Sequence, residues 1–255
     1  MSAQTVVGLN LSVFVITLNE QRCIARVISQ AKKLSDDVVV IDSGSTDETV
    51  SIAESLGARV FHQKWLGYGQ QKRFGEDCCK YDVVLNLDAD EVLSNELVYE
   101  IKAHLISGAS LPCSIKVTTV YPYQEKPRLW ADYNSVVRLY NKNQMRFREH
   151  ATWDTVVVPD KFKPHEFKNK CYHYSFENFE HYIFKLNRYT SFQRKSIGKN
   201  KKIKLFIMIA FGFPWEFFRA YILKRHFTGG LYGIGMSMTR AYFRIMKYLK
   251  QLEKN

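Results

Sequence analysis

The chain has 255 residues, of which 46% are hydrophobic, and its formal net charge is +12. This length and apolar content allow one sizeable core with room for an appended subdomain. Five cysteines, an odd number without Cys-x-x-Cys spacing, argue against a disulfide framework or a zinc site and favour a reducing compartment. The first eleven residues lack the pattern of a signal peptide, so no secretory leader is expected.

The charge is unevenly distributed along the chain. Residues 1–160 contain 17 Lys and Arg against 20 Asp and Glu, whereas residues 161–255 contain 20 against 5. All of the basic excess therefore belongs to the C-terminal part. A basic half of this kind predicts an anionic partner, either nucleic acid or the anionic surface of a membrane.

The N-terminal part alternates between predicted strands and predicted helices. Short apolar runs suited to buried strands lie at residues 12–18, 38–41 and 58–61. The segments between them carry apolar residues at helical spacing, and the second of these helices can be capped by Ser45 or Thr46 and closed by Gly57. This alternation predicts right-handed βαβ units and a parallel sheet.

A further apolar run, Val83 to Leu87, ends in three acidic residues: Asp88, Asp90 and Glu91. Because an unpaired buried charge costs several kcal/mol or more, these carboxylates need a cation. Two aspartates spaced i, i+2 could offer oxygens to one Mg²⁺ or Mn²⁺, which would take its other ligands from substrate phosphates. The alternative is a solvated turn that leads into a helix starting near Ser94.

Polar side chains follow three of the predicted strands at the point where each strand ends. The carboxyl ends of parallel strands meet at one edge of a sheet, so these side chains should converge on a ligand crevice. They are Thr17, Asn19 and Glu20 after the first strand, Asp42 and Ser43 after the second, and Asp88 and Asp90 after the run at 83–87. No Gly-x-Gly-x-x-Gly follows the first strand, which disfavours a dinucleotide-binding Rossmann domain. In the stretch Gly67 to Gly75, Lys72 and Arg73 could face phosphate, or the stretch is a flexible loop before a helix.

Three stretches together resemble the family 2 glycosyltransferases of the GT-A fold: residues 12–20, 39–47 and 85–91. The resemblance implies an α/β fold with a mostly parallel sheet flanked by helices. It also implies an inverting transferase that uses a nucleotide-activated sugar and a divalent metal, Mg²⁺ or Mn²⁺. The nucleotide-sugar residues carried over by position are Thr17, Leu18, Asn19, Glu20, Asp42, Lys72 and Asp88, and Asp90 would bind the metal.

Residues 92–160 are expected to hold the acceptor side. Strands are predicted at residues 115–121 and 136–140, and an aromatic block at 124–134 could stack on sugar rings or pack on itself. Inversion requires a general base that takes the proton of the acceptor hydroxyl. By resemblance to related transferases the base is Asp154, with Glu149 as the alternative, although either carboxylate could instead pair with Arg146 or Arg148.

His173 follows a segment predicted to contain no strand. A lone histidine is commonly structural, but by resemblance to GT-A folds His173 would complete the metal site, and neutral imidazole is an acceptable ligand for Mn²⁺.

From Phe176 onward the sequence predicts aromatic and basic helices. The segment from Gly198 to Lys202 breaks the first helix, Gly229 to Gly235 forms a hinge, and residues 238–252 form a last basic helix. The apolar run at 205–214 is too short to span a bilayer, which needs about 20 residues, and is expected to be interfacial, re-entrant or packed on the core. Basic amphipathic helices of this kind predict binding to an anionic membrane, the alternative being a solvated basic face.

The tail, including residues 173–182, 185–190 and 214–224, resembles the bacterial lipopolysaccharide core β-1,4-glucosyltransferases. This implies UDP-glucose as donor and a lipid-anchored inner-core heptose as acceptor, at the cytoplasmic face of the bacterial inner membrane. We therefore expect a GT-A domain over residues 1–175 and a membrane-facing helical extension over 176–255.

Two rival interpretations remain at this point. One is a family 2 transferase with another donor sugar or a polyprenyl-phosphate acceptor. The other is a basic nucleic-acid-binding protein, but the sequence contains no RNP-like, helix-turn-helix or zinc-finger pattern, so no nucleic-acid partner is expected.

Overall fold

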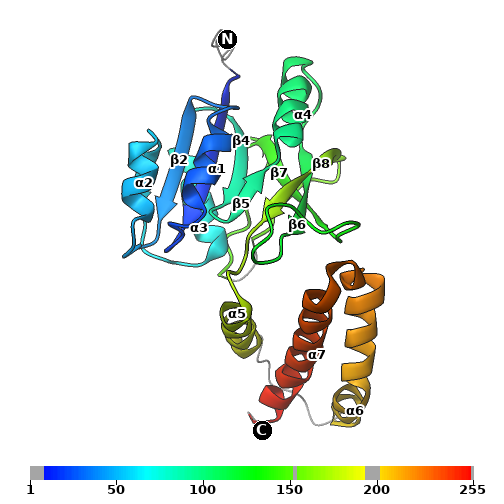
Figure 1. Cartoon of the computed structure of the whole chain (residues 1–255). Helices are drawn as coiled ribbons and strands as arrows, with labels where there is room; N and C mark the ends of the chain where they lie inside the picture. Colours follow the sequence, from blue (N-terminus) through cyan, green and yellow to red (C-terminus); the bar gives the residue numbers. More distant parts are fainter. Residues whose placement is uncertain (1–8, 152–153, 193–201, 254–255) are drawn as a thin grey trace. The chain divides into compact units, whose positions relative to one another are not determined.

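The structure is a computed structural model that describes residues 9–151, 154–192 and 202–253. Within this part of the chain, eight strands belong to one sheet: β1 (Leu11–Thr17), β2 (Asp37–Asp42), β3 (Arg59–His62), β4 (Val83–Asp88), β5 (Glu91–Leu93), β6 (Cys113–Thr119), β7 (Asn134–Asn141) and β8 (His165–His173). The α-helices are α1 (Ile24–Ala31), α2 (Thr49–Ser55), α3 (Tyr68–Cys78), α4 (Asn95–Ile106), α5 (Phe179–Phe192), α6 (Lys202–Phe218) and α7 (Gly230–Leu252) (Figure 1). A π-helix, η2 (Arg219–Leu223), and a 3₁₀-helix, η3 (His226–Gly229), connect α6 to α7.

The chain divides into two compact units. The first, the sheet unit, comprises Met1–Thr118 and Tyr133–Ser175, and the second, the helical unit, comprises Thr119–Asp132 and Phe176–Asn255. The boundary after Ser175 coincides with the domain boundary expected from sequence. The segment Thr119–Asp132, which the sequence assigned to the first domain, instead clusters with the helices.

The sheet has the strand order β3-β2-β1-β4-β7-β6-β8-β5. The first four strands pair in parallel, as the βαβ pattern predicts, and β7 continues the sheet antiparallel to β4. The pairs β6–β7 and β5–β8 are also antiparallel, so the sheet is mixed rather than mostly parallel. Antiparallel neighbours need no crossover helix, and the chain between β6 and β7 contains none.

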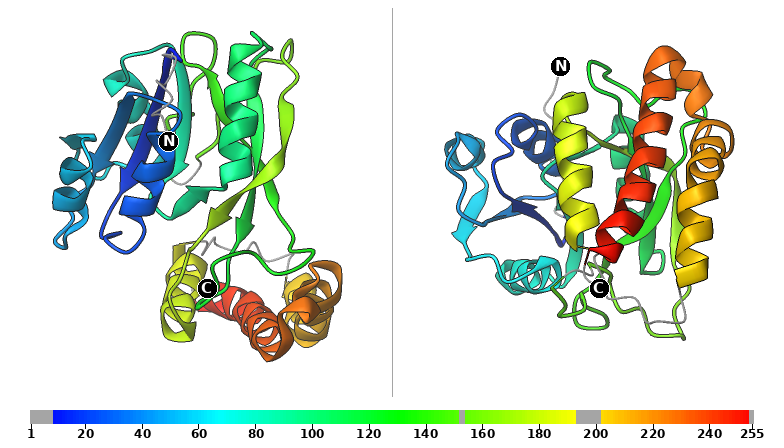
Figure 2. Two further views of the ribbon diagram at one scale, coloured as in Figure 1. Left: turned by 45° about the horizontal axis from the view of Figure 1, so that its top comes forward. Right: turned by 90° about the horizontal axis from the view of Figure 1, so that it is seen from below.

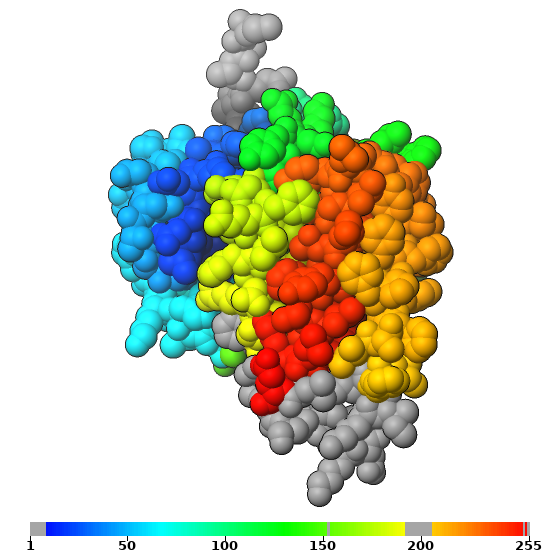
Figure 3. All heavy atoms as spheres, turned by 60° about the horizontal axis from the view of Figure 1, so that its bottom comes forward, coloured from blue at the N-terminus to red at the C-terminus, as the bar shows by residue number. Residues whose placement is uncertain are grey.

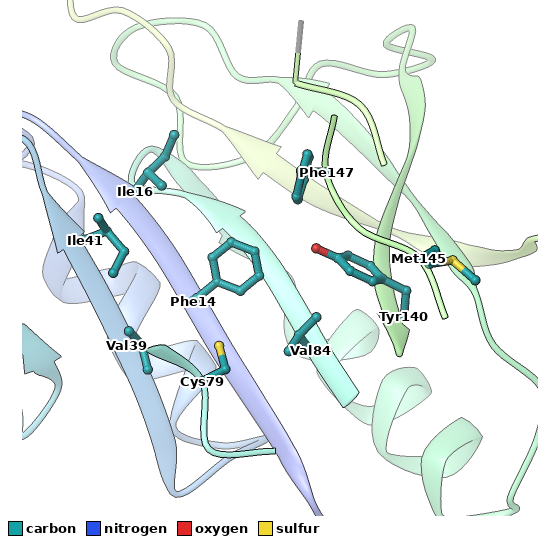
Figure 4. Close-up of a cluster of buried hydrophobic side chains, with 9 residues drawn as sticks. All are labelled: Phe14, Ile16, Val39, Ile41, Cys79, Val84, Tyr140, Met145 and Phe147. Atoms are coloured by element: carbon teal, nitrogen blue, oxygen red, sulfur yellow. The ribbon is translucent and has the colours of Figure 1, made fainter. Parts of the chain in front are cut away.

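The core of the sheet unit lies where α3 packs against β1 and β2. A Cβ atom at Gly75 of α3 would lie 2.6 Å from the Phe14 ring, so glycine permits this close packing. Figure 2 shows α1 and α4 together on one side of the sheet. The buried cluster around Phe14 contains Ile16, Val39, Ile41, Cys79, Val84, Tyr140, Met145 and Phe147 (Figure 4).

In the helical unit, α7 lies between α5 and α6 (Figure 3). Its small core consists of Tyr121, Phe176, Tyr182 and Met236. Gly229 lies directly against Tyr121, where a Cβ atom would come within 2.5 Å of the ring. The segment from 119 to 132 is therefore part of this unit's packing.

Several elements of the sheet unit differ from the sequence prediction. The segment before His173 is a strand, β8, because its cross-strand partners, among them β5, are distant in sequence and satisfy its backbone. The stretch from Gly67 to Gly75 is mostly helix rather than loop, and the apolar run after Asp154 forms only an isolated bridge, Val156 to Phe147. The N-cap residue of α2 is Glu48, without a side-chain cap hydrogen bond, rather than Ser45 or Thr46, and the preceding Asp47 carboxylate accepts from the Thr49 N–H.

The helical unit also corrects two predictions. The apolar run at 205–214 is not an isolated ten-residue segment, because the helix continues through Pro214 into η2. Residues 206–223 are, by length and composition, long and apolar enough to cross a membrane. The predicted hinge at Gly229–Gly235 is confined to the turn before α7, and Gly233 and Gly235 lie inside that helix. Most of the break predicted at 198–202 lies outside the described residues.

The buried His226 makes the stability of the helical unit sensitive to acid. Burial, followed by the nearby charges of Arg128 and Arg240, lowers the pKa of His226 to about 3, with Asp132 and Lys224 the other charged groups facing it. In the unfolded chain His226 therefore becomes protonated as the pH falls below about 6.5, whereas in the folded chain it stays neutral. This contribution to stability is present above pH 6.5 and is lost as the pH falls, with a limiting slope of about 1.4 kcal/mol per pH unit.

We predict that His226→Asn reduces the loss of stability between pH 7 and pH 5, measured by urea unfolding followed by circular dichroism. The exposed His165 provides the matched control, His165→Asn, which should keep the wild-type slope. An unchanged slope in His226→Asn would contradict the assignment.

Candidate active site

Register places the ends of the parallel strands side by side. Thr17 at the end of β1 pairs with Asp42 at the end of β2, and Ile16 pairs with Asp88 at the end of β4. The polar clusters predicted to converge therefore lie at one edge of the sheet.

The loops after β1 and β2 are fastened to each other. The Asn19 side-chain oxygen accepts from the Thr46 N–H at 2.8 Å, and the Glu20 N–H donates to the Thr49 hydroxyl at 2.8 Å. The Asp42 carboxylate is buried and accepts from the N–H groups of Gly44 and Ser45. Burial opposes its ionisation, but these hydrogen bonds hold the pKa of Asp42 below its usual range. Asp42 therefore organises the turn after β2.

Lys72 of α3 is the centre of the charged cluster. Its side chain is fully buried, and its Nζ lies 2.9 Å from Asp88 Oδ1 and 3.1 Å from Asp154 Oδ2. The ammonium also lies 5.1 Å from the centre of the Phe147 ring, within cation–π range. From sequence, Lys72 could face phosphate or lie in a flexible loop; in the structure it lies in α3 and bridges two carboxylates that are distant in sequence.

Arg138 on β7 is a second buried cation that the sequence reading missed. Its guanidinium contacts Asp88 Oδ2 at 3.1 Å, Glu91 Oε1 at 2.7 Å and the Asn86 side-chain oxygen at 2.5 Å. A signal was present, because an arginine inside the apolar strand predicted at 136–140 must find buried acidic partners.

The two buried cations keep Asp88 ionised. Burial alone would raise the pKa of Asp88, but Lys72 and Arg138 together hold it far below its usual range. Burial, reinforced by the charge of Asp88, raises the pKa of Glu91 despite the opposing effect of Arg138. Asp88 is therefore the firmly anionic member of the cluster.

Asp90 and His173 form a second pair at the same edge. The Nε2 atom of His173 lies 3.2 Å from Asp90 Oδ2; the His173 side chain is partly exposed, whereas Asp90 is buried. Burial lowers the pKa of His173, but the carboxylates of Asp90, Glu91 and Asp88 outweigh it and raise the pKa to about 9. Among the described residues no group of three side chains is arranged to hold a metal.

The segment that carries the two candidate bases is packed on the N-terminus of α3. The N–H groups of Tyr68 and Gly69 donate to the carbonyls of Ala151 and His150 at 3.1 and 3.0 Å. A Cβ atom at Gly69 would lie 2.0 Å from the Arg148 carbonyl oxygen, so only glycine permits this approach. Farther along the same helix, the buried Glu76 accepts hydrogen bonds from Tyr140 and from the Phe147 N–H.

The two candidate bases differ in their surroundings. Asp154 has 44% of its side chain exposed and is anchored to Lys72, whereas Glu149 is 65% exposed and pairs with Arg73 at 3.3 Å. The structure brings Asp154 into the charged cluster with Asp88, and it gives Glu149 no contact with that cluster.

Other predicted binding residues lie around this edge. Leu18 is 48% exposed, and the buried Thr17 hydroxyl has no hydrogen-bond partner. The Gln71 side-chain oxygen is likewise buried and unpartnered, while its nitrogen donates to Ser43 at 2.9 Å. Two buried polar oxygens without partners, at the end of β1 and on the neighbouring α3, suit a polar ligand.

The chain matches Glycosyl transferase family 2 over residues 12–162. It is 40% identical over 256 residues to an uncharacterized glycosyltransferase of Rickettsia bellii, an alignment that covers 95% of this chain and 86% of that protein. The chain therefore belongs to glycosyl transferase family 2, and the predictions of a glycosyltransferase and of an α/β GT-A fold are confirmed.

More distant similarities are more specific in name. The lipopolysaccharide core biosynthesis glycosyltransferase LpsC of Rhizobium meliloti is 24% identical over 97% of this chain and 93% of its own length. The structure of glucosyl-3-phosphoglycerate synthase from Mycobacterium tuberculosis with Mn²⁺, UDP-glucose and phosphoglyceric acid is 28% identical. It covers 44% of this chain and 43% of that chain, with a TM-score of 0.35.

The bridging position of Lys72 predicts a large effect on stability. Lys72→Met removes the ammonium and leaves two carboxylates close together without their shared cation, which should cost about 3 kcal/mol of unfolding free energy. Urea unfolding measures this loss. The exposed Lys64 gives the matched control, Lys64→Met, which should stay within about 0.5 kcal/mol of wild type. Equal stability of the two variants would refute the bridge.

Proposed function

We propose that this chain is an inverting, metal-dependent glycosyltransferase that moves glucose from UDP-glucose to the heptose inner core of a lipid-anchored lipopolysaccharide. The observation that carries the proposal is the arrangement at the end of β4. There Asp88 reaches Asp154 through Lys72, and Asp90 lies beside His173. In this proposal Asp88 supplies an anionic group for the nucleotide sugar, Asp90 and His173 supply a metal site, and Asp154 supplies the base. Such a transfer needs all three.

The residues fit a divalent cation that takes its other ligands from water and a diphosphate. Asp90 would supply a carboxylate oxygen, acceptable to Mg²⁺ and Mn²⁺, and His173 would supply an imidazole nitrogen acceptable to Mn²⁺ once the cation has displaced the proton that its raised pKa retains. The His173 side chain is 31% exposed and the largely buried Asp90 side chain 12%, so the pair opens to solvent at His173. When bound, the cation neutralises the charge that develops on the departing diphosphate.

The chain's own residues account for the proton transfer. The acceptor hydroxyl attacks the anomeric carbon, its proton passes to the Asp154 carboxylate, and the bond from that carbon to the diphosphate oxygen breaks. UDP leaves with the bonding electron pair, and the anomeric configuration is inverted because the hydroxyl attacks the face of the carbon opposite the departing diphosphate. Lys72 holds one oxygen of Asp154 at 3.1 Å and leaves the partly exposed carboxylate able to accept the proton.

The nucleotide would bind at the ends of β1 and β2. The unpartnered Thr17 hydroxyl, the exposed Leu18 and the loop held by Asn19 and Glu20 line this region. Asp88 would contact the ribose or the sugar.

The choice of donor and acceptor rests on relatives. The likeness to LpsC along nearly the whole chain supports a lipopolysaccharide core acceptor at the cytoplasmic face of the inner membrane. A glucosyl-3-phosphoglycerate synthase of Petrotoga mobilis, 36% identical over 107 residues, supports a glucosyl donor. A different donor sugar or a polyprenyl-phosphate acceptor is the alternative, and a panel of UDP-sugars distinguishes the donors.

We predict that Asp90→Asn reduces Mn²⁺-dependent release of UDP from UDP-glucose by at least about 100-fold, because a metal ligand is lost. It should also abolish the added thermal stabilisation that Mn²⁺ gives in the presence of UDP. Asp82, at the opposite end of the same strand segment, offers the control Asp82→Asn, which should behave as wild type. Full metal dependence in Asp90→Asn would place the metal elsewhere.

The base assignment has its own test. Asp154→Asn should lower kcat by about 10² to 10⁴ while leaving the stabilisation by UDP and Mn²⁺ intact, because the amide oxygen can still accept from Lys72 but the side chain can no longer take the proton. Glu149→Gln should retain nearly full activity in the same steady-state assay. The reverse pattern would transfer the role to Glu149.

A further inference from the structure

The helix α6 exposes an apolar face. From residue 206 to its end, every exposed residue of the helix is apolar, and Phe206, Phe211 and Trp215 are 71%, 67% and 59% exposed. At 3.6 residues per turn, the exposed positions occupy one half of the helix circumference. They include Phe206, Ile207, Phe211, Pro214, Trp215 and Phe218.

The opposite half of the helix is less apolar than the exposed half. It contains the buried Gly212 and Glu216, and the Glu216 carboxylate accepts from Arg219 at 3.1 Å. A helix on the surface of a water-soluble domain shows the reverse arrangement, with its apolar stripe toward the core. An outward-facing apolar half is the arrangement expected of a helix in contact with lipid hydrocarbon.

Exposed large apolar side chains are concentrated in the helical unit. Among the described residues, eighteen such side chains belong to this unit and eight to the larger sheet unit. Exposed basic residues accompany them, including Lys185, Arg188, Arg225 and Arg244. Aromatic and aliphatic side chains next to basic ones match the acyl boundary and the anionic headgroups of a bilayer.

A lipid surface accounts for this face better than a protein partner does. Protein interfaces mix polar groups with apolar ones and carry about one hydrogen bond per 100–200 Å². Between residues 206 and 218, the exposed half of α6 offers one polar side-chain group, the indole N–H of Trp215, and tryptophan is a residue typical of membrane interfaces. Hydrocarbon offers no hydrogen-bond partner and so demands such a face.

The helix is better suited to lie in the membrane plane than to cross it. A crossing segment would carry Glu216 and Arg219 through the hydrocarbon, whereas a helix lying flat keeps the half that contains Glu216 against α7. The returning helix α7 carries Arg240, Arg244, Lys247 and Lys250, which also opposes a second crossing.

We propose that the exposed half of α6 inserts in plane into the acyl boundary of an anionic bilayer. This deepens the proposed function, because it rests on that function for the lipid-anchored acceptor, and it specifies which surface meets the membrane. Embedding α6 would hold the enzyme at the membrane that carries the acceptor.

The test measures binding of the full chain to vesicles of phosphatidylethanolamine and phosphatidylglycerol by co-sedimentation. Phe211→Ser combined with Phe218→Ser should weaken partitioning by at least tenfold. Moving a single phenylalanine side chain from water into the acyl region already changes the partition constant by about that factor. The matched control is Tyr99→Ser on α4. The Tyr99 side chain is 71% exposed, the same fraction as Phe206 on α6, and this variant should bind vesicles as wild type does. Unchanged binding of the double variant overturns the proposal.

Depth is measured with brominated lipids and one tryptophan at a time. Three chains are compared, each with a single tryptophan and with every other tryptophan replaced by phenylalanine. The single tryptophan is Trp215, Ile207→Trp or Ile222→Trp, and in each chain its fluorescence should be quenched by bromine at the same shallow position. Quenching of the three from clearly different depths would instead indicate a crossing helix and overturn in-plane insertion.

Two further controls separate the outcomes. UDP release in detergent-free solution by the Phe211 and Phe218 variant should stay near wild type, which shows that loss of vesicle binding is independent of the transfer chemistry. If the wild-type chain forms a dimer that the double variant loses, while neither binds vesicles, the face belongs to a second copy and the lipid proposal fails.

Discussion

The site depends on one buried ammonium group. Lys72 lies between Asp88, at the end of β4, and Asp154, in a loop 82 positions further along the chain than Lys72. A fully buried lysine without carboxylates would be costly, and two carboxylates this close without a cation would repel each other. The three groups therefore stabilise one another, and the fully buried Lys72 depends most on its partners.

The helix α3 also contacts the segment that precedes Asp154 and helps to position it. Gly69, Lys72 and Glu76 are spaced at i, i+3 and i+7, so they share one face of α3. Gly69 meets the backbone of residues 148–150, and Glu76 holds the Phe147 N–H and Tyr140. The candidate base thus belongs to a loop that is fixed along the length of one helix.

Much of this site could be predicted from the sequence because parallel strands carry their carboxyl ends to one edge. Thr17, Asp42 and Asp88 are neighbours by register, as that rule requires. The partners of Lys72 and Arg138 could not be predicted, since they come from elements more than ten residues away whose pairing has no local signature. Strand β8 was missed for the same reason: its pairing with β5 is set by tertiary contacts. On α6, the sequence showed an apolar run but not which half of the helix is covered by α7.

The most direct test of the account is the position of a metal in crystals grown with UDP and Mn²⁺. Anomalous scattering locates the ion without reference to activity. If Asp90 and His173 hold the metal, a single anomalous-difference peak should lie within coordination distance of the Asp90 carboxylate and the His173 imidazole. The Lys72 bridge between Asp88 and Asp154 should remain intact. A peak held by other residues, or UDP bound away from the ends of β1 and β2, would contradict it.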